Sequence, residues 1–137
     1  MSGLGVVQAE EATLFLFENF KITDNDNILN IGICGASKEY PVGSLLEIDA
    51  LWYKNSHYHL HQPTTHTITC LDEEATDATH KIVDMESYGF YQGVKGMKNA
   101  YIFKIVSDHF EPQSVTKERT KNLLFTQIDE IMKRVNQ

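Results

Sequence analysis

The sequence predicts an α/β fold of three layers, in which helices cover both faces of a mixed, mostly parallel central sheet. Short apolar runs that are typical of buried strands alternate along the chain with segments that have helical spacing. The chain has 137 residues, of which 42% are hydrophobic, so we expect one domain over residues 1–137 with a substantial core.

The first half of the chain is expected to contain one helix and three strands. Residues 6–20 include a run that is apolar on all sides, which predicts a well-buried helix. Residues 28–34 form a short apolar run of the kind found in buried parallel strands. Residues 45–53 have the β-prone composition of a single strand, and residues 65–71 alternate weakly as a further strand would.

The second half continues the alternation of strand and helix. Residues 81–83 indicate a brief strand, and residues 86–95 a helix weakened by two glycines. Residues 100–106 are nearly all β-prone and predict the clearest strand. Residues 115–135 carry apolar side chains at helical spacing and predict the clearest helix.

Composition and charge exclude several classes of partner. The net charge of −7 argues against a protein that binds nucleic acid, because such a protein requires a basic surface. The chain has neither an apolar run long enough to span a membrane nor a visible signal peptide, so we expect a cytoplasmic protein without membrane contacts. Cys34 and Cys70 have no close spacing and are expected to be free thiols.

Two acidic residues stand where predicted strands end. Glu86 follows the strand over residues 81–83, and Asp108 follows the strand over residues 100–106. Ligands of open α/β sheets bind outside the carboxyl ends of the strands. We therefore expect a pocket into which Glu86 and Asp108 both point.

The motifs around these acids occur in an order that resembles a known superfamily. Met85-Glu86 opens a helix, Ser107-Asp108 closes the next strand, and residues 31–36 read IGICGA. In this order they resemble the purine nucleoside phosphorylase and nucleosidase superfamily, and within it the bacterial hexameric purine nucleoside phosphorylases. The resemblance implies a shortened nucleoside phosphorylase-like domain that lacks the N-terminal strands of the family.

The resemblance also implies roles for the two acids. Glu86 would accept hydrogen bonds from the ribose hydroxyls, while Met85 packs against the sugar. Asp108, with Ser107 beside it, would protonate the leaving purine base, and such general acid catalysis typically contributes ~100- to 10,000-fold. The implied function is binding of a purine nucleoside and cleavage of its N-glycosidic bond, by a pentosyltransferase (a nucleoside phosphorylase) or by a hydrolase (a nucleosidase).

Three further positions receive weaker assignments from the same resemblance. Arg119, which follows Glu118, would approach Asp108 and assist proton transfer. Cys34 and Gly35 would line the base or ribose side of the pocket.

The chain departs from the family where phosphate would bind. Its only two arginines, Arg119 and Arg134, both fall in the last predicted helix. Ile33 stands where many members have a hydroxyl that contacts phosphate. Gly3 and Gly5, ahead of the first predicted helix, are the remaining candidates for an anion site, so phosphate as a co-substrate stays open.

Two alternatives follow from these departures. Beside a chain that cleaves nucleosides by itself, one alternative is a non-catalytic module that retains a nucleoside pocket. The other is one subunit of a split enzyme whose partner supplies the missing strands. In each case we expect a homo-oligomer, at least a dimer, because a sheet without its early strands has an edge to cover. No cofactor is expected other than phosphate as a possible co-substrate.

Residues 54–66 are expected to be irregular and are rich in histidine. His57, His59 and His61 would share one face of an extended strand, where they could bind a metal or complete the sugar pocket of a neighbouring subunit. A polar, solvated loop is the simpler interpretation, so we expect no metal site. Tyr58 or Tyr88 could replace the base-stacking aromatic residues of the family.

Overall fold

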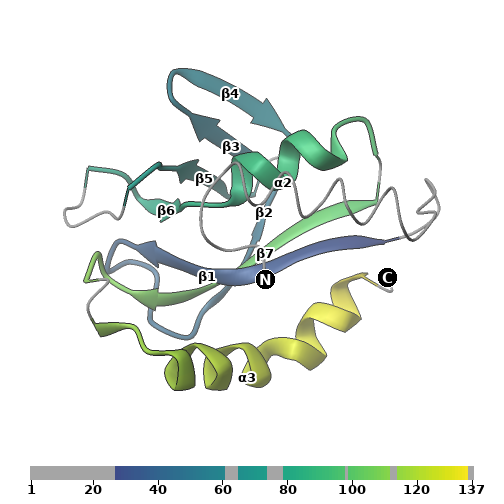
Figure 1. Ribbon diagram of the computed structural model, residues 1–137. Coiled ribbons are helices and arrows are strands. Elements are labelled where there is room, and N and C mark those ends of the chain that lie inside the picture. The colour runs from purple at the N-terminus through teal and green to yellow at the C-terminus, as the bar shows by residue number, and fades with distance from the viewer. Residues whose placement is uncertain (1–26, 61–64, 74–78, 98, 112–113, 136–137) are drawn as a thin grey trace.

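The computed structural model describes residues 27–60, 65–73, 79–97, 99–111 and 114–135. Within them, seven strands form one sheet in the order β2-β7-β1-β6-β5-β3-β4, and two helices pack on its opposite faces (Figure 1). The elements are β1 Ile28–Ala36, β2 Leu45–Ile48, β3 Ala50–Tyr53, β4 Ser56–His59, β5 Thr67–Cys70, β6 Ile82–Asp84, α2 Ser87–Val94, β7 Ala100–Asp108 and α3 Lys117–Val135.

Two long parallel strands, β1 and β7, form the centre of the sheet and stay in register from Ile28↔Ala100 to Cys34↔Val106. Side chains of β1 alternate between the two layers. Ile28 and Cys34 belong to the core cluster that includes residues of α2, whereas Leu29 and Ile31 pack against the cluster under α3. Because both faces of this strand are covered, its sequence is apolar almost throughout.

The predicted fold class is confirmed: helices cover both faces of a mixed sheet. Three of the six strand pairings are parallel, β1–β7, β3–β5 and β5–β6, and the long β1–β7 pairing contributes most of the parallel contact. The other three pairings, β1–β6, β2–β7 and β3–β4, are antiparallel.

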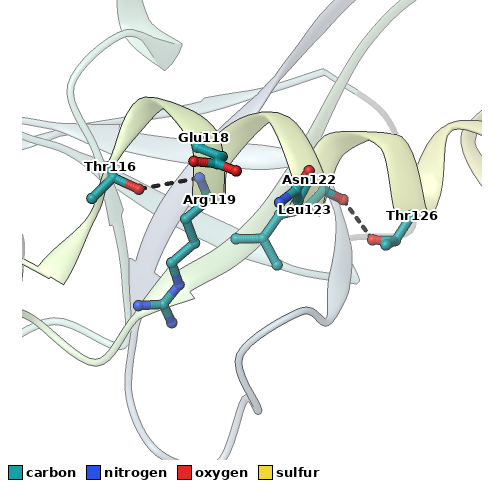
Figure 2. Close-up of a pocket in the computed structure, with 6 residues that line it drawn as sticks. All are labelled: Thr116, Glu118, Arg119, Asn122, Leu123 and Thr126. Carbon is teal, nitrogen blue, oxygen red and sulfur yellow. Dashed lines mark hydrogen bonds between the residues drawn. The ribbon is translucent and has the colours of Figure 1, made fainter.

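The helix α3 lies along β7 and β1, with Ile131 and Val135 buried against Phe103. It begins after Thr116, whose side-chain oxygen accepts a hydrogen bond of 3.1 Å from the backbone N–H of Arg119, as an N-cap does (Figure 2). None of the helices formed by the described residues is long and apolar enough to cross a membrane.

The prediction of a single strand over residues 45–53 is wrong, because the chain breaks at Asp49. On one side of the break β2 pairs with β7, and on the other side β3 pairs with β5. Asp49 makes three hydrogen bonds at the break: its N–H donates to the carbonyl of His66 (3.1 Å), and its own carbonyl and carboxylate accept from the N–H groups of Leu60 (2.7 Å) and Thr65 (2.8 Å). These bonds satisfy the backbone where the strand pairing stops.

The prediction that residues 54–66 are irregular is wrong in part. Residues Ser56–His59 form β4, which pairs antiparallel with β3 and ends the sheet. The turn of this hairpin places Lys54 at a φ of 55°, in the left-handed region. Residues 61–64, and with them His61, lie outside the described residues, as do Gly3, Gly5 and the helix predicted over residues 6–20.

Candidate functional site

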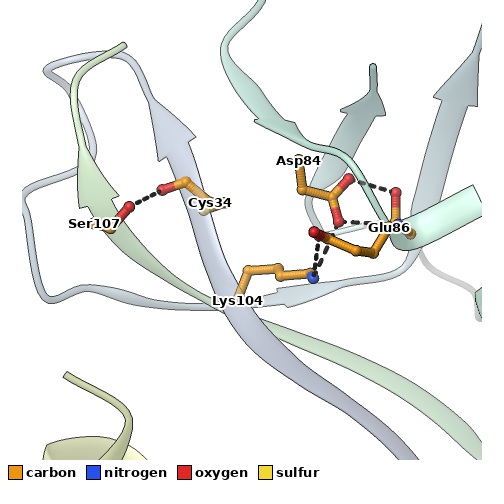
Figure 3. A network of polar contacts seen from close by, with 6 residues as sticks. Cys34, Asp84, Glu86, Lys104 and Ser107 are labelled. Carbon is orange, nitrogen blue, oxygen red and sulfur yellow. Dashed lines mark hydrogen bonds and ion pairs between the residues drawn. The ribbon is translucent and has the colours of Figure 1, made fainter. Parts of the chain in front are cut away.

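A buried ion cluster joins two strands, β7 and β6, to the start of α2 (Figure 3). Lys104 of β7 extends its Nζ to 3.0 Å from Oδ2 of Asp84, and both side chains are almost fully buried, at 2% and 1% exposure. Because β1 lies between β7 and β6, the lysine must cross β1 to reach the aspartate. It crosses at Gly32, where a Cβ would lie 3.2 Å from Nζ, so a glycine leaves the lysine its path.

Asp84 also anchors the start of α2. Its two carboxylate oxygens accept hydrogen bonds from the backbone N–H of Ser87 (3.0 Å) and from the Ser87 hydroxyl (2.7 Å). The residue that connects this anchored turn to the helix is Glu86, which occupies the N-cap position of α2. The contacts of Asp84 therefore fix the backbone that carries Glu86.

Glu86 is the member of the cluster that reaches solvent. Its Oε2 lies 3.9 Å from Nζ of Lys104, and its side chain is 20% exposed. Burial raises the pKa of Glu86 above its ordinary value, although Lys104 opposes this shift and Asp84 adds to it. Burial alone would lower the pKa of Lys104, but the two carboxylates and the hydrogen bond to Asp84 raise it, so the lysine carries its positive charge.

A second polar group follows further along the same strand. The Ser107 hydroxyl lies 3.2 Å from the carbonyl oxygen of Cys34 (Figure 3). It also lies 2.5 Å from Oδ1 of Asp108. The other oxygen of Asp108, Oδ2, accepts a hydrogen bond of 2.8 Å from the N–H of Glu111. Ser107 and Asp108 are 1% and 8% exposed, so both groups act in surroundings with little water.

Cys34 and Gly35 connect the two polar groups. Burial raises the pKa of the Cys34 thiol to about 12. Lys104 opposes this rise, whereas Asp84 and Asp108 add to it, so the thiol lies within electrostatic reach of all three. Gly35 stands at a register shift between β1 and β7, and a Cβ there would lie 3.2 Å from the Val83 side chain. This close approach brings β6 against β1 beside the two groups.

The expectation that a shared carboxyl edge brings Glu86 and Asp108 together is wrong in its premise. The strand β6 runs antiparallel to β1, with Gly35 opposite Val83, so its end points back along the sheet. The Glu86 cluster therefore lies beside Gly32, whereas Asp108 pairs with Gly35. Gly32 and Gly35 are three residues apart on β1, which corresponds to about 10 Å along the strand.

Arg119 stands in the first turn of α3. Its guanidinium donates a hydrogen bond of 3.3 Å to the carbonyl of Ser114, and the residue lines a hollow of about 340 Å³ together with other residues of the same helix, Asn122 and Leu123 among them (Figure 2). No hydrogen bond or ion pair joins it to Asp108 in the described part of the chain. Its contribution to proton transfer stays a prediction.

The sequence interpretation missed the buried ion pair between Asp84 and Lys104. The signal was a lysine in the middle of an apolar strand, since a lysine that is fully buried requires a partner of opposite charge. The partner lies twenty residues earlier in the chain, at a helix start, and the pair could be recognised only once the order of the strands was known.

The predicted aromatic residues form a stack between α2 and the β3–β4 hairpin. The rings of Tyr53 and Tyr88 are stacked with centroids 4.1 Å apart, and Tyr58 lies against Tyr88 (5.3 Å) and Tyr91 (5.1 Å). No group of three or more possible metal ligands occurs among the described residues, which do not include His61.

The fold has relatives of known structure, although no protein-family model and no curated protein matches this sequence. A candidate 5′-methylthioadenosine/S-adenosylhomocysteine nucleosidase from Francisella philomiragia superposes with a TM-score of 0.74 at 17% identity, over 99% of this chain and 78% of its own. A mutant of the Helicobacter pylori nucleosidase of the same activity, with 5′-methylthioadenosine in its active site, gives a TM-score of 0.73 at 11% identity, over 94% and 78%. The Helicobacter pylori futalosine hydrolase gives 0.72 at 12% identity, over 94% and 77%.

These proteins share the nucleoside phosphorylase fold. The more specific resemblance to the bacterial hexameric phosphorylases stays a prediction. What the comparisons establish is the architecture: this chain has the fold of the nucleosidases and of futalosine hydrolase.

Proposed function

We propose that this chain binds a purine nucleoside and cleaves its N-glycosidic bond with water. One observation carries the proposal. The fold is shared with nucleosidases, and in it the solvent-accessible carboxylate of Glu86 lies 3.9 Å from the buried Lys104 of β7. A second carboxylate, that of Asp108, contacts the Ser107 hydroxyl further along β7.

Glu86 is suited to hold the ribose. An ionised carboxylate accepts two hydrogen bonds, which matches the adjacent 2′ and 3′ hydroxyls of a ribose. Its negative charge also favours the positive charge that develops on the anomeric carbon as the bond to the base breaks. Lys104 opposes the rise in the pKa of Glu86 and so favours its ionised form, and the lysine is itself held by Asp84.

Asp108 is suited to protonate the departing base. A serine hydroxyl has one hydrogen, yet the Ser107 oxygen lies within hydrogen-bond distance of both Asp108 and the Cys34 carbonyl. Ser107 can therefore donate to only one of these two acceptors at a time, and its contact with Oδ1 helps to hold the Asp108 carboxyl group in place. A carboxyl group held beside the base of a bound nucleoside can pass a proton to purine N7, as general acid catalysis requires.

Water is the favoured acceptor of the sugar. Ile33 has no hydroxyl for an anion, and by strand alternation from Ile31 it belongs to the α3 side of β1, away from Lys104. Both arginines are in α3, and the lysine of the site is held by Asp84. Phosphorolysis would require an anion site on the Glu86 side of the sheet, for which the sequence candidates, Gly3 and Gly5, lie outside the described residues.

A non-catalytic nucleoside-binding protein is the second candidate. The observation in its favour is that both oxygens of Asp108 are already engaged, by Ser107 and by the N–H of Glu111. A base could recruit this acid only if one of these contacts gives way. Such a protein would bind nucleoside without releasing base.

The test is to incubate the purified protein with adenosine, inosine and 5′-methylthioadenosine, with and without phosphate, and to measure free base. We expect release that does not depend on phosphate. Asp108→Asn should reduce release by about 100-fold or more while nucleoside still binds, and Glu86→Gln should weaken binding itself. Asp129→Asn, which changes an exposed carboxylate on α3, is the matched control.

Each other outcome has a distinct meaning. Release that requires phosphate would overturn hydrolysis and retain the site. Binding without release would establish the second candidate. Absence of both binding and release, or equal activity in the Asp108 and Glu86 variants and the control, would contradict the assignment of the site.

A further inference from the structure

A hollow of about 430 Å³ opens on the face of the sheet opposite α2, across β3, β5 and β6. Its floor includes Thr67 and Thr69, which alternate with Ile68, a residue of the core on the α2 side. Trp52 pairs with Thr69 in the sheet and forms one wall. The volume lies within the range of small-molecule sites in proteins, about 300 to 1,000 Å³.

The lining of this hollow is cationic and rich in hydroxyl groups, in a chain whose net charge is −7. Among the described residues, Lys54, His80 and Lys81 are the titratable residues that line it, and none of the lining residues is a carboxylate. The one ionic partner of Lys81 within the described part of the chain is Glu39, at 3.5 Å. Both side chains are more than half exposed, so the pair is weak and an anion can displace it. Lys54 rests over the Tyr53 ring, 5.3 Å from its centroid, and can turn toward a ligand by a rotamer change.

Trp52 adds a flat apolar surface to this charged setting. Its side chain remains 42% exposed, although it stacks on His57 with centroids 4.6 Å apart. An exposed indole at the wall of a hollow is a platform on which a planar ring can stack, and stacking of a base on an aromatic side chain contributes about 1 to 3 kcal/mol. The hollow therefore combines a platform for a ring with donors and cations for an anionic group.

We propose that this hollow is a second ligand site, which binds a planar aromatic ring that carries a phosphate or carboxylate group. The ring stacks on Trp52, and the anionic group is held by Lys81 and the threonine hydroxyls, with Lys54 closing on it. The site lies on the opposite face of the sheet from Glu86, so its existence does not depend on the proposed nucleosidase activity.

The chain offers a direct readout, because Trp52 is its only tryptophan. Titration with adenosine 5′-monophosphate, excited at 295 nm, an ordinary wavelength for selective tryptophan excitation, should quench the fluorescence in a saturable manner. Adenosine, which has the ring without the charge, should bind at least about tenfold more weakly. Inorganic phosphate should leave the fluorescence unchanged and compete with the nucleotide.

Variants test the assignment of the residues. Lys81→Gln and Thr69→Val should each raise the Kd for the nucleotide by about fivefold, which corresponds to one modest polar contact. Lys95→Gln, at an exposed lysine beyond the end of α2, should leave the Kd unchanged and is the matched control. Trp52→Phe, followed by calorimetry, should retain binding with reduced affinity.

Three results would overturn the proposal: no saturable quenching at millimolar nucleotide, equal affinity for adenosine and its monophosphate, or equal effects of Lys81→Gln and Lys95→Gln. The titration is repeated in the Glu86→Gln variant, in which binding at the proposed nucleoside site is weakened. Quenching that survives there with an unchanged Kd belongs to the second site whether or not the protein cleaves nucleosides, so the two proposals fail independently.

Discussion

Replacement of Lys104 by methionine isolates the buried ion cluster. Methionine has a similar length and no charge, so Lys104→Met removes the cation that Asp84 contacts at 3.0 Å and leaves two carboxylates facing each other with little access to water. Loss of one member of a buried ion pair typically costs about 3 to 5 kcal/mol, because the remaining charge is left without a partner. This is a large share of a total stability that is ordinarily about 5 to 15 kcal/mol.

The expected loss can be expressed as a melting temperature. An unfolding entropy of about 2 cal/mol/K per residue over 137 residues converts 3 to 5 kcal/mol into a decrease of about 11 to 18 °C. The double variant Lys104→Met/Asp84→Asn should recover at least about 2 kcal/mol, since it no longer buries an unpaired aspartate. Differential scanning calorimetry and urea unfolding measure both, with Lys133→Met, at an exposed lysine, as the control within about 0.5 kcal/mol of the unchanged chain.

A loss below about 1 kcal/mol in Lys104→Met would refute this reasoning, because a lysine that is 2% exposed would then have been dispensable. A double variant no more stable than the single one would also refute it. In that case the cost would come from packing and not from the unpaired charge.

Three further predictions follow from the same contacts. Because the pKa of Glu86 is raised and only its ionised form accepts two hydroxyl hydrogen bonds, nucleoside affinity should fall as the pH drops through that raised pKa. Lys104→Met should move this fall in affinity to higher pH, and Glu86→Gln should abolish it, as isothermal titration at several pH values would show. Burial raises the pKa values of Cys34 and Cys70 from 9.0 to about 12, so both thiols should react with a disulfide reagent at pH 8 about 1,000-fold more slowly than exposed thiols. Both should become fully reactive after unfolding, and fast labelling of the folded protein would contradict their burial. Ser87→Ala, which removes a buried hydroxyl bonded to the carboxylate at the start of α2, should lower the unfolding free energy by about 1 to 2 kcal/mol in a urea titration, and an unchanged midpoint would show that the backbone contact alone suffices.

The centre of the fold could be predicted because local composition determines it. Residues 28–34 and 100–106 are apolar on both sides of the strand, which only a covered central position satisfies, and they became β1 and β7. The break at Asp49 could not be predicted in this way. Its partners at His66, Leu60 and Thr65 come from a later part of the chain, so a β-prone segment looked continuous.

The candidate site was likewise predictable only where local sequence determines it. Glu86 and Asp108 were visible because each follows a strand within a short motif. Their relative placement was not, since the antiparallel direction of β6 is decided by pairing and not by its three residues. Lys104 gave a sequence signal, a charge inside an apolar strand, but only the strand order identified Asp84 as its partner.

The lysine that crosses β1 at Gly32 has a consequence for the proposed choice of substrate. If Glu86 holds the sugar and Asp108 serves the base, one strand, β7, carries both the cation beneath the sugar carboxylate and, four residues later, the acid for the base. The register with β1 places these two positions about 10 Å apart along the sheet, and this spacing sets the distance between the sugar end and the base end of a ligand. Changes in the surrounding loops can then alter which purine or which 5′ substituent fits, while the spacing itself changes only if the central strand shifts its register.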